Sequence, residues 1–322
     1  MEWWMYLIIG FVVFGLLLPF LVMLPLVPNV LWKFVLTRSR PDKWSREEWK
    51  EFKDEEIKAM HQAGNDFRAG HKDKCKEVSI VSEGYHLVGE YYDFGGKGCA
   101  IFLGGRCDTL VYTAFYADPY VKAGYNILIV DWRSHGLSEG NLFGAGIAET
   151  ADSLAWIRFA HDELGNPEIV LHGVCIGGQS WLLTAAREDF PSYVKSIVAD
   201  GLYLSFYRMF TSHVIKNHQF PWPFMPILRG IMKRRNHVDI KLDSVEFKGN
   251  LIKTPVLAIG GRQDQFVPNK ETEEAVKRLG SEKKRCVFLL EGIHSHFRYR
   301  NQETYDQTVS EWLKEIGEGE KE

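Results

Sequence analysis

The sequence predicts an α/β fold in which helices cover both faces of a mostly parallel sheet, preceded by an N-terminal transmembrane helix. Two observations carry this prediction. Short β-rich runs alternate with helix-length segments after residue 76, and an apolar stretch without charged residues opens the chain. Each crossover between parallel strands requires a helix-length connection, so such alternation favours a parallel sheet. With 322 residues, 45% of them hydrophobic, the chain can bury one large core.

The first apolar run is expected to be a membrane anchor. From Trp3 to about Leu26 the chain carries no charged residue. A stretch of about 24 residues suffices to cross roughly 30 Å of hydrocarbon. Trp and Tyr side chains flank the run, as is typical of membrane interfaces. Residues 1–32 are therefore predicted to form the anchor. Three prolines are expected to bend or end its helix: Pro19, Pro25 and Pro28.

A cleavable signal peptide is the main alternative for this run. Such peptides have a basic start, a shorter apolar stretch and small residues at the cleavage site, whereas Met1 and Glu2 supply no basic side chain. A buried hairpin of the fold is disfavoured by the length of the run. Basic residues follow directly, and the positive-inside rule then places the rest of the chain in the cytoplasm. We expect a single-pass protein of the cell membrane with a cytoplasmic domain.

Residues 33–76 are predicted to form a charged amphipathic linker helix between the anchor and a domain formed by residues 77–322. Ser45 followed by Glu48 has the pattern of a capping box, which favours a helix start at that point. Apolar residues recur in this stretch at roughly helical spacing: Trp44, Trp49, Phe52, Ile57 and Met60.

Charge and cysteine content exclude several classes of function. The formal net charge is -3 and no long basic tract is present, so nucleic-acid binding has no electrostatic support. The five cysteines lack the paired short spacings of a zinc site or a disulfide framework. We expect free thiols in a reducing compartment, although the odd count leaves one disulfide open. No metal or nucleotide motif is present, and no cofactor is expected.

Eight β-rich runs mark the expected strands. They are VSIVS, YHLVGEYYDF, CAIFLGG, NILIVDW, EIVLHG, KSIVADG, VLAIGG and CVFLLEG. Helices are expected between the later runs, for example at 149–164 and 180–188. In open parallel sheets, ligands bind beyond the carboxyl ends of the strands. Candidate site residues are therefore those that directly follow each run.

The run EIVLHG leads into Gly173-Val174-Cys175-Ile176-Gly177-Gly178 and then into a helix. This is the G-x-S-x-G pattern of a nucleophile on a sharp strand-to-helix turn, with cysteine at the central position. Glycines flank such a turn because its backbone is strained and crowded. The N-terminal end of the following helix favours the thiolate form. A cysteine is more often an inert buried side chain, but its position here predicts a nucleophile.

Candidate partners follow in the order nucleophile, acid, base. Asp264, in the loop after VLAIGG, is expected to orient a histidine, and His294, after CVFLLEG, is the expected general base. Taken alone, Asp264 is often only a turn cap and His294 only a solvated loop residue. Their order after Cys175 favours catalysis. His296 remains an alternative base and Asp200 a reserve acid.

Acyl transfer also needs backbone N–H groups that stabilise the oxyanion. The amide directly after the nucleophile, that of Ile176, is one expected donor. The second is Gly105, in the loop FLGGRC after an early strand. Arg106 adds positive charge nearby.

From about residue 77 to residue 316 the chain resembles the α/β-hydrolase superfamily, especially its serine aminopeptidase-like and monoacylglycerol-lipase-like branches. Besides the turn at Cys175, DWRSHGLSEG is similar to the family's Asp-x-Arg-x-x-Gly-x-Ser segment, and TPVLAIGGRQDQFVP to its acid-bearing strand and loop. The resemblance implies an α/β-hydrolase fold with a helical cap insertion, expected at about 201–250. The chain departs from the pattern at Cys175, where serine is usual, and at Leu103, where many relatives have histidine.

The resemblance extends to dienelactone hydrolase and to bile-acid amino-acid acyltransferases, which implies that this fold can use a Cys-His-Asp triad. We expect a membrane-anchored hydrolase of esters or thioesters that forms an acyl-enzyme on Cys175. Such an intermediate can also pass to an amine or alcohol, so an acyltransferase stays open. A non-catalytic binding or redox-sensing module is a third hypothesis, against which the complete triad argues.

The substrate is expected to be a small molecule or a lipid with an acyl group. The anchor and the aromatic residues of the cap favour a lipophilic acyl chain, although each aromatic side chain can equally pack the cap onto the core. The cap residues concerned are Phe206, Tyr207, Met209, Phe210, Phe220, Trp222, Phe224 and Met225. The sequence makes no prediction of oligomeric state.

Overall fold

The computed structural model describes residues 2–38, 44–47 and 54–318. Its centre is an eight-stranded sheet in the order β1-β2-β4-β3-β5-β6-β7-β8. The strands are β1 (Cys75–Ser82), β2 (Tyr85–Tyr92), β3 (Cys99–Leu103), β4 (Asn126–Val130), β5 (Ile169–Val174), β6 (Val194–Asp200), β7 (Val256–Gly261) and β8 (Lys284–Leu289). β1 pairs antiparallel with β2, β2 antiparallel with β4, and all other neighbours are parallel. The predicted mostly parallel sheet with antiparallel strands at its start is confirmed, and each predicted run is a strand.

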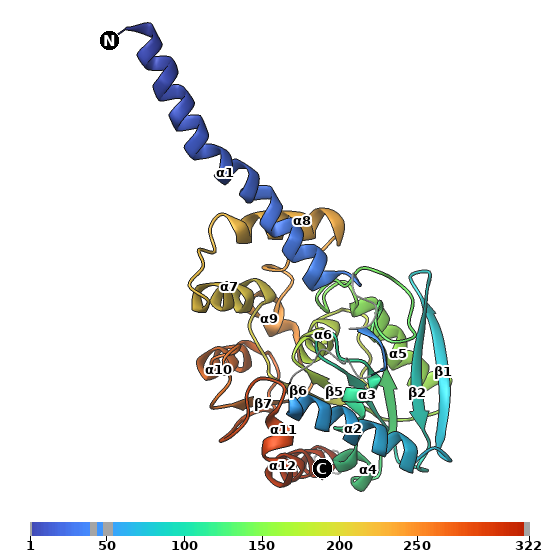
Figure 1. The fold of residues 1–322 in the computed structure, drawn as a ribbon. Coiled ribbons are helices and arrows are strands. Elements are labelled where there is room, and N and C mark those ends of the chain that lie inside the picture. Colours follow the sequence, from blue (N-terminus) through green and yellow to red (C-terminus); the bar gives the residue numbers. More distant parts are fainter. Residues whose placement is uncertain (1, 39–43, 48–53, 319–322) are drawn as a thin grey trace.

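Helices cover both faces of this sheet (Figure 1). One core cluster packs the sheet against α5 (Thr150–Asp162), α6 (Ile176–Ala185) and α10 (Asn269–Arg278), and the other against α3 (Leu110–Ala114), α4 (Asp118–Lys122) and α12 (Gln302–Glu318). Successive side chains of a strand point to opposite faces. In β3, for example, Ile101 belongs to the first cluster and Phe102 to the second. Both are fully buried, as expected for a strand covered on both faces.

The apolar N-terminal run forms α1 (Trp3–Leu36), which is longer than predicted. It projects from the domain in Figure 1, and by length and composition it could cross a membrane, a criterion that a signal sequence also meets. None of the three prolines ends the helix, because its last turns are held by packing against α8 (Phe224–Arg235). There the Trp32 indole donates a 2.8 Å hydrogen bond to Asn236, and Leu36 is buried. The anchor boundary predicted at residue 32 therefore falls inside this helix.

The prediction of a helix through residues 33–76 is wrong for the described part of that segment. α1 ends at Leu36, residues 45–47 form bends, and α2 spans Glu55–Gly70. Asp54 starts α2, since its carboxylate accepts hydrogen bonds from the amides of Glu56 (3.0 Å) and Ile57 (3.4 Å). The rest of the predicted pattern, Glu48, Trp49 and Phe52, lies outside the described residues.

α2 packs on the domain and is more than a linker. A Cβ added at Gly64 would lie 1.8 Å from the Val111 carbonyl oxygen, so α2 touches the backbone of α3 directly. Arg68 forms two hydrogen bonds with Glu90 of β2. Upstream, the Trp44 indole is buried and stacks on His135 with ring centroids 4.3 Å apart. The segment that precedes β1 is therefore integral to the domain.

The insertion between β6 and β7 forms three helices in the region predicted for a cap: α7 (Phe206–Lys216), α8 and α9 (Val245–Lys248). Ser205 caps α7 by accepting a hydrogen bond from the Arg208 amide. A bidentate pair of 2.6 Å contacts joins Arg229 of α8 to Asp239. In Figure 1 the cap lies on the side of the domain from which α1 projects.

Candidate active site

Cys175 occupies the turn between β5 and α6. Its φ of 53° and ψ of -112° are strained for a residue with a Cβ. The strain is held in place by the sheet, because the Cys175 amide donates a 2.6 Å hydrogen bond to the Asp200 carbonyl at the end of β6. The side chain is partly exposed and packs against both core clusters. The turn therefore displays the thiol at the carboxyl edge of the sheet.

The glycines around Cys175 are required by backbone contacts. A Cβ on Gly173 would lie 2.3 Å from the Gly177 carbonyl carbon. A Cβ on Gly177 would lie 2.3 Å from the Leu103 carbonyl oxygen of β3. Real atoms do not approach so closely, so either side chain would push α6 away from the strands.

His294 and Asp264 meet as the sequence predicts. His294 Nδ1 lies 2.7 Å from Asp264 Oδ2, and the Asp264 side chain is only 2% exposed. The other carboxylate oxygen of Asp264 accepts hydrogen bonds from the amides of Phe266 (2.7 Å) and Val267 (2.9 Å). These bonds fix the carboxylate, and the carboxylate in turn fixes the orientation of the imidazole.

His294 also interacts with Cys175. Burial by itself would lower the pKa of His294, but attraction to the Cys175 thiolate and hydrogen bonds with Asp264 and Cys175 raise it well above its ordinary value. The interactions with Cys175 and Asp264 thus outweigh the effect of burial on the pKa of His294. The structure thus brings together the three residues predicted as nucleophile, base and acid.

The two reserve candidates have other partners. His296 Nδ1 lies 2.8 Å from Glu56 Oε2. Asp200 accepts a 2.9 Å hydrogen bond from the Tyr305 hydroxyl, and burial raises its pKa to about 7. Neither residue has the position that a base beside Cys175, or an acid bonded to that base, would require.

The predicted oxyanion donors differ in their surroundings. Ile176 is the first residue of α6, so its amide is one of those that a helix leaves without an internal partner. The Gly105 amide instead donates a 2.9 Å hydrogen bond to the Asp108 carboxylate. A Cβ on Gly105 would lie 3.7 Å from the Cys175 Cβ, which shows how near this loop is to the thiol. Gly105 can serve the oxyanion only after this bond is exchanged.

Asp108 is a site residue that the sequence analysis missed. Burial raises the pKa of its carboxyl, and the Gly105 amide and the charges of Arg106 and His294 act in the opposite direction. Its only signal in the sequence is its place three residues after Gly105, in a loop that follows a strand.

Gly201 and Tyr203 were also missed as individual site residues. A Cβ on Gly201 would lie 2.8 Å from His294 Cε1, so this glycine leaves room for the imidazole. The Tyr203 hydroxyl is buried and has no hydrogen-bond partner among the described residues. Both follow β6 directly, where strand-end residues were expected to contribute.

The aromatic and methionine residues of the predicted cap differ in burial. Phe206, Met209 and Met225 are buried in the core cluster that α6 shares. Phe220 and Trp222 are 82% and 77% exposed. The remaining three, Tyr207, Phe210 and Phe224, are half-buried. The alternative that such side chains pack the cap onto the core therefore holds for the first group, and the last three remain candidates for a pocket lining.

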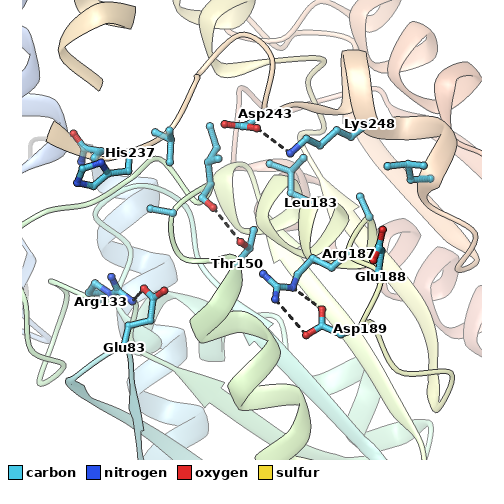
Figure 2. A pocket seen from close by; sticks show the side chains of 16 residues that line it. Glu83, Arg133, Thr150, Leu183, Arg187, Glu188, Asp189, His237, Asp243 and Lys248 are labelled. Carbon is cyan, nitrogen blue, oxygen red and sulfur yellow. Dashed lines mark hydrogen bonds and ion pairs between the residues drawn. The ribbon is translucent and has the colours of Figure 1, made fainter. Parts of the chain in front are cut away.

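A large hollow of about 850 Å³ lies elsewhere, between the cap and the ends of α5 and α6 (Figure 2). Cys175, His294 and Asp264 do not line it. Six of its charged side chains are engaged in ion pairs: Arg133 with Glu83, Arg187 with Asp189, and Lys248 with Asp243. Charges that are already paired offer little to a charged ligand, so this hollow adds nothing to the chemistry at Cys175.

Metal-based chemistry finds no support in the described part of the chain. No group of three or more His, Cys, Asp and Glu side chains there is arranged to hold a metal ion. All five cysteines are described, and none of them forms a disulfide.

Comparison with known proteins identifies the fold. Residues 101–226 match a family model described as the alpha/beta hydrolase fold. YqkD of Bacillus subtilis is 25% identical over 206 residues, which cover 63% of this chain and 67% of that protein. YfhR of Escherichia coli is 22% identical over 193 residues, which cover 60% of this chain and 61% of that protein.

Solved structures agree. The Pyrococcus furiosus esterase Pf2001 superposes with a TM-score of 0.61 at 22% identity, over 77% of this chain and 95% of the esterase. The enol-lactonase from Burkholderia xenovorans gives a TM-score of 0.52 at 19% identity, over 74% of this chain and 100% of the lactonase. The chain therefore has the α/β-hydrolase fold.

Proposed function

We propose that this protein is a membrane-anchored hydrolase that cleaves esters or thioesters through a Cys175-His294-Asp264 triad. One observation carries the proposal: a cysteine in a strained strand-to-helix turn lies beside a histidine whose other nitrogen is 2.7 Å from a buried carboxylate. A purely structural cysteine gains nothing from a strained turn, whereas a nucleophile gains exposure to a substrate.

The reaction proceeds in two halves. His294 holds the thiol proton, and the Cys175 sulfur forms a bond to the substrate carbonyl carbon, which gives a tetrahedral oxyanion. When the oxyanion collapses, the bond to the alcohol or thiol breaks and the leaving group takes the proton from His294. Water then gives a proton to His294 and attacks the carbonyl carbon of the thioester, which forms a second tetrahedral oxyanion. When this oxyanion collapses, the bond to the Cys175 sulfur breaks and the carboxylic acid is released. Asp264 keeps the imidazole oriented throughout.

Backbone amides stabilise both oxyanions. The Ile176 amide points from the first turn of α6, where the helix dipole adds positive potential. The second donor is Gly105, and the substrate carbonyl must replace Asp108 as its acceptor.

The substrate class rests on two features outside the triad. The Pyrococcus protein is an esterase and the Burkholderia protein an enol-lactonase, both of which cleave acyl–oxygen bonds. The apolar α1 packs against the cap, so in the proposed orientation the cap faces the lipid surface. A lipophilic acyl substrate delivered from the membrane fits this arrangement.

Acyl release from a panel of p-nitrophenyl esters and acyl thioesters of increasing chain length tests the proposal. Wild type, Cys175→Ala and Cys175→Ser are compared, with Cys286→Ala as the control, because Cys286 is a half-buried thiol on β8, away from the triad. We expect Cys175→Ala to lose at least about 1,000-fold in kcat and Cys286→Ala to retain wild-type turnover. Equal turnover in wild type and Cys175→Ala would overturn the proposal.

A further inference from the structure

The loop that carries His294 has a strained backbone. It follows β8, and within it Gly292 has a φ of 94° and Ser295 a φ of 66°. The His296 amide donates a 3.0 Å hydrogen bond to the Ile293 carbonyl and closes a turn around His294. A non-glycine residue in the left-handed region is strained by roughly 1 kcal/mol or more, so the turn persists only where its surroundings impose it.

Two contacts from distant parts of the chain impose this turn. The Tyr116 hydroxyl donates a 3.0 Å hydrogen bond to the Ser295 carbonyl. One residue further on, His296 Nδ1 meets Glu56 Oε2 at 2.8 Å. Residues 295 and 296 directly follow the proposed base, so these contacts fix the backbone from which His294 projects.

Glu56 is itself held by a rigid support. It lies in the first turn of α2, which Asp54 caps and which contacts α3 at Gly64. Its second carboxylate oxygen pairs with Arg300 of α11 (Phe297–Arg300). Because each of its carboxylate oxygens has a charge-assisted partner, the Glu56 side chain holds the loop at His296 at a fixed position relative to α2.

Several charged groups surround His296. Glu56 Oε2 lies 2.8 Å from Nδ1 and Asp54 Oδ2 lies 4.0 Å from Nε2. Burial lowers the pKa of His296, Asp54 and Asp108 oppose this, and His294 adds to it. The bond to Glu56 requires only a proton on Nδ1, which the imidazolium and one neutral tautomer both carry.

We propose that Glu56 is a positioning residue for the general base. Through His296 it holds the turn that aims His294 at Cys175, which makes the segment between the apolar helix and the first strand a working part of the active site. The inference rests on the proposed function, since His294 is the base of that reaction.

The test compares Glu56→Ala with Glu56→Gln and with Glu55→Ala in the full-length protein. Glu55 is the matched control, because it lies in the same helical turn, carries the same charge and has an 81% exposed side chain that pairs with Lys58. Glu56→Gln keeps an oxygen that can accept from His296. Two quantities are measured: kcat and KM for a p-nitrophenyl ester, and the rate at which iodoacetamide alkylates Cys175 as a function of pH.

We expect Glu56→Ala to lower kcat by about 10- to 100-fold with KM within about 2-fold, since a misplaced base harms the chemical step more than binding. Its alkylation profile should shift to higher pH, because a displaced imidazolium no longer stabilises the thiolate. Glu56→Gln should recover most of both losses, and Glu55→Ala should match wild type. His296→Phe, which keeps a ring but removes the donor to Glu56, should reproduce the Glu56→Ala profile and covers the case in which Glu56→Ala does not fold.

The readouts separate this proposal from the proposed function. If no ester is turned over by wild type, the hydrolase proposal fails, but the alkylation profiles still decide the role of Glu56. If Cys175→Ala abolishes turnover while Glu56→Ala and Glu55→Ala behave alike in both assays, the hydrolase proposal stands and the positioning role is wrong.

Discussion

The turn at Cys175 and the loop at His294 are held in place by different means. The nucleophile turn is fixed by backbone packing within neighbouring strands, as the contacts of Gly173 and Gly177 with their surroundings show. The base loop is fixed by side chains that reach it from far along the chain, Glu56 and Tyr116. One half of the proposed site is therefore built by local backbone geometry and the other by long-range side-chain contacts.

This difference predicts different responses to mutation. Tightly packed backbone leaves no room for an added side chain, so a substitution at the turn around Cys175 should lower both stability and activity. Loss of a single side-chain contact leaves the fold intact, so substitutions around His294 should lower activity more than stability. The following mutations test that contrast.

The largest combined effect is expected from Gly173→Ala. The new Cβ would meet the Gly177 carbonyl carbon at 2.3 Å, and α6 would have to move away from β5. We expect a loss of about 3 kcal/mol or more in the free energy of unfolding and a loss of at least about 100-fold in kcat. Urea titration and ester hydrolysis measure the two losses.

Gly230→Ala is the control for this substitution. Gly230 lies within α8, and a Cβ there meets nothing within 4 Å. Alanine should stabilise that helix by up to about 1 kcal/mol without changing activity. If Gly173→Ala were as well tolerated as Gly230→Ala, the nucleophile turn would not be locked by its backbone.

Asp264→Asn should show the opposite signature, a large loss of activity in a folded protein. The asparagine oxygen can keep the bonds to the Phe266 and Val267 amides, so the loop keeps its shape. Its amide nitrogen is a donor and cannot accept the hydrogen bond from His294 Nδ1–H, so the imidazole then adopts the wrong tautomer. A loss of about 1,000- to 10,000-fold in kcat follows, with little change in unfolding free energy.

Asp200→Asn is the matched control, because Asp200 is a fully buried carboxyl that also feels the charge of His294 but bonds to Tyr305 instead. Its effect on kcat should be at least about ten times smaller than that of Asp264→Asn. A larger loss in Asp200→Asn would reverse the assignment of the acid.

The contrast between local backbone packing and long-range side-chain contacts also explains which parts of the site the sequence could predict. The strands, the turn at Cys175 and the loop positions of Asp264 and His294 all have local signatures, namely β-rich runs, flanking glycines and residues that directly follow a strand. The structure places each of them where its pattern indicates. Local patterns were informative because the sheet itself brings strand ends together at one edge.

Side chains that act over long sequence separations left no such signature. Glu56 precedes His296 by 240 residues and looks in the sequence like an ordinary first-turn glutamate. The same limit applies to α1, whose last turns are held by contact with α8 some 200 residues later. Proline spacing favoured an earlier end of that helix, and tertiary packing overrode it.

Asp108→Asn tests the loop that lies near both Cys175 and His294. The asparagine oxygen can still accept from the Gly105 amide, so only the charge is removed. Burial raises the pKa of Asp108, which means that the folded state holds its proton more tightly than the unfolded state. Stability in the wild type is therefore complete below the unfolded pKa of about 3.9 and falls as pH rises through the folded pKa.

The asparagine variant should escape this fall, so its stability relative to wild type should be greater at pH 7 than at pH 4. Its kcat/KM should match wild type at low pH and exceed it by about 3- to 10-fold at higher pH, because no carboxylate then repels the oxyanion. Asp189→Asn is the control: Asp189 is exposed, and its hydrogen bond with Arg187 lowers its pKa, so any pH trend in stability should be small and of the opposite sign. Activity of Asp108→Asn below wild type at every pH would show instead that the carboxylate takes part in the reaction, which would move Asp108 from an obstacle at the Gly105 amide to a member of the catalytic set.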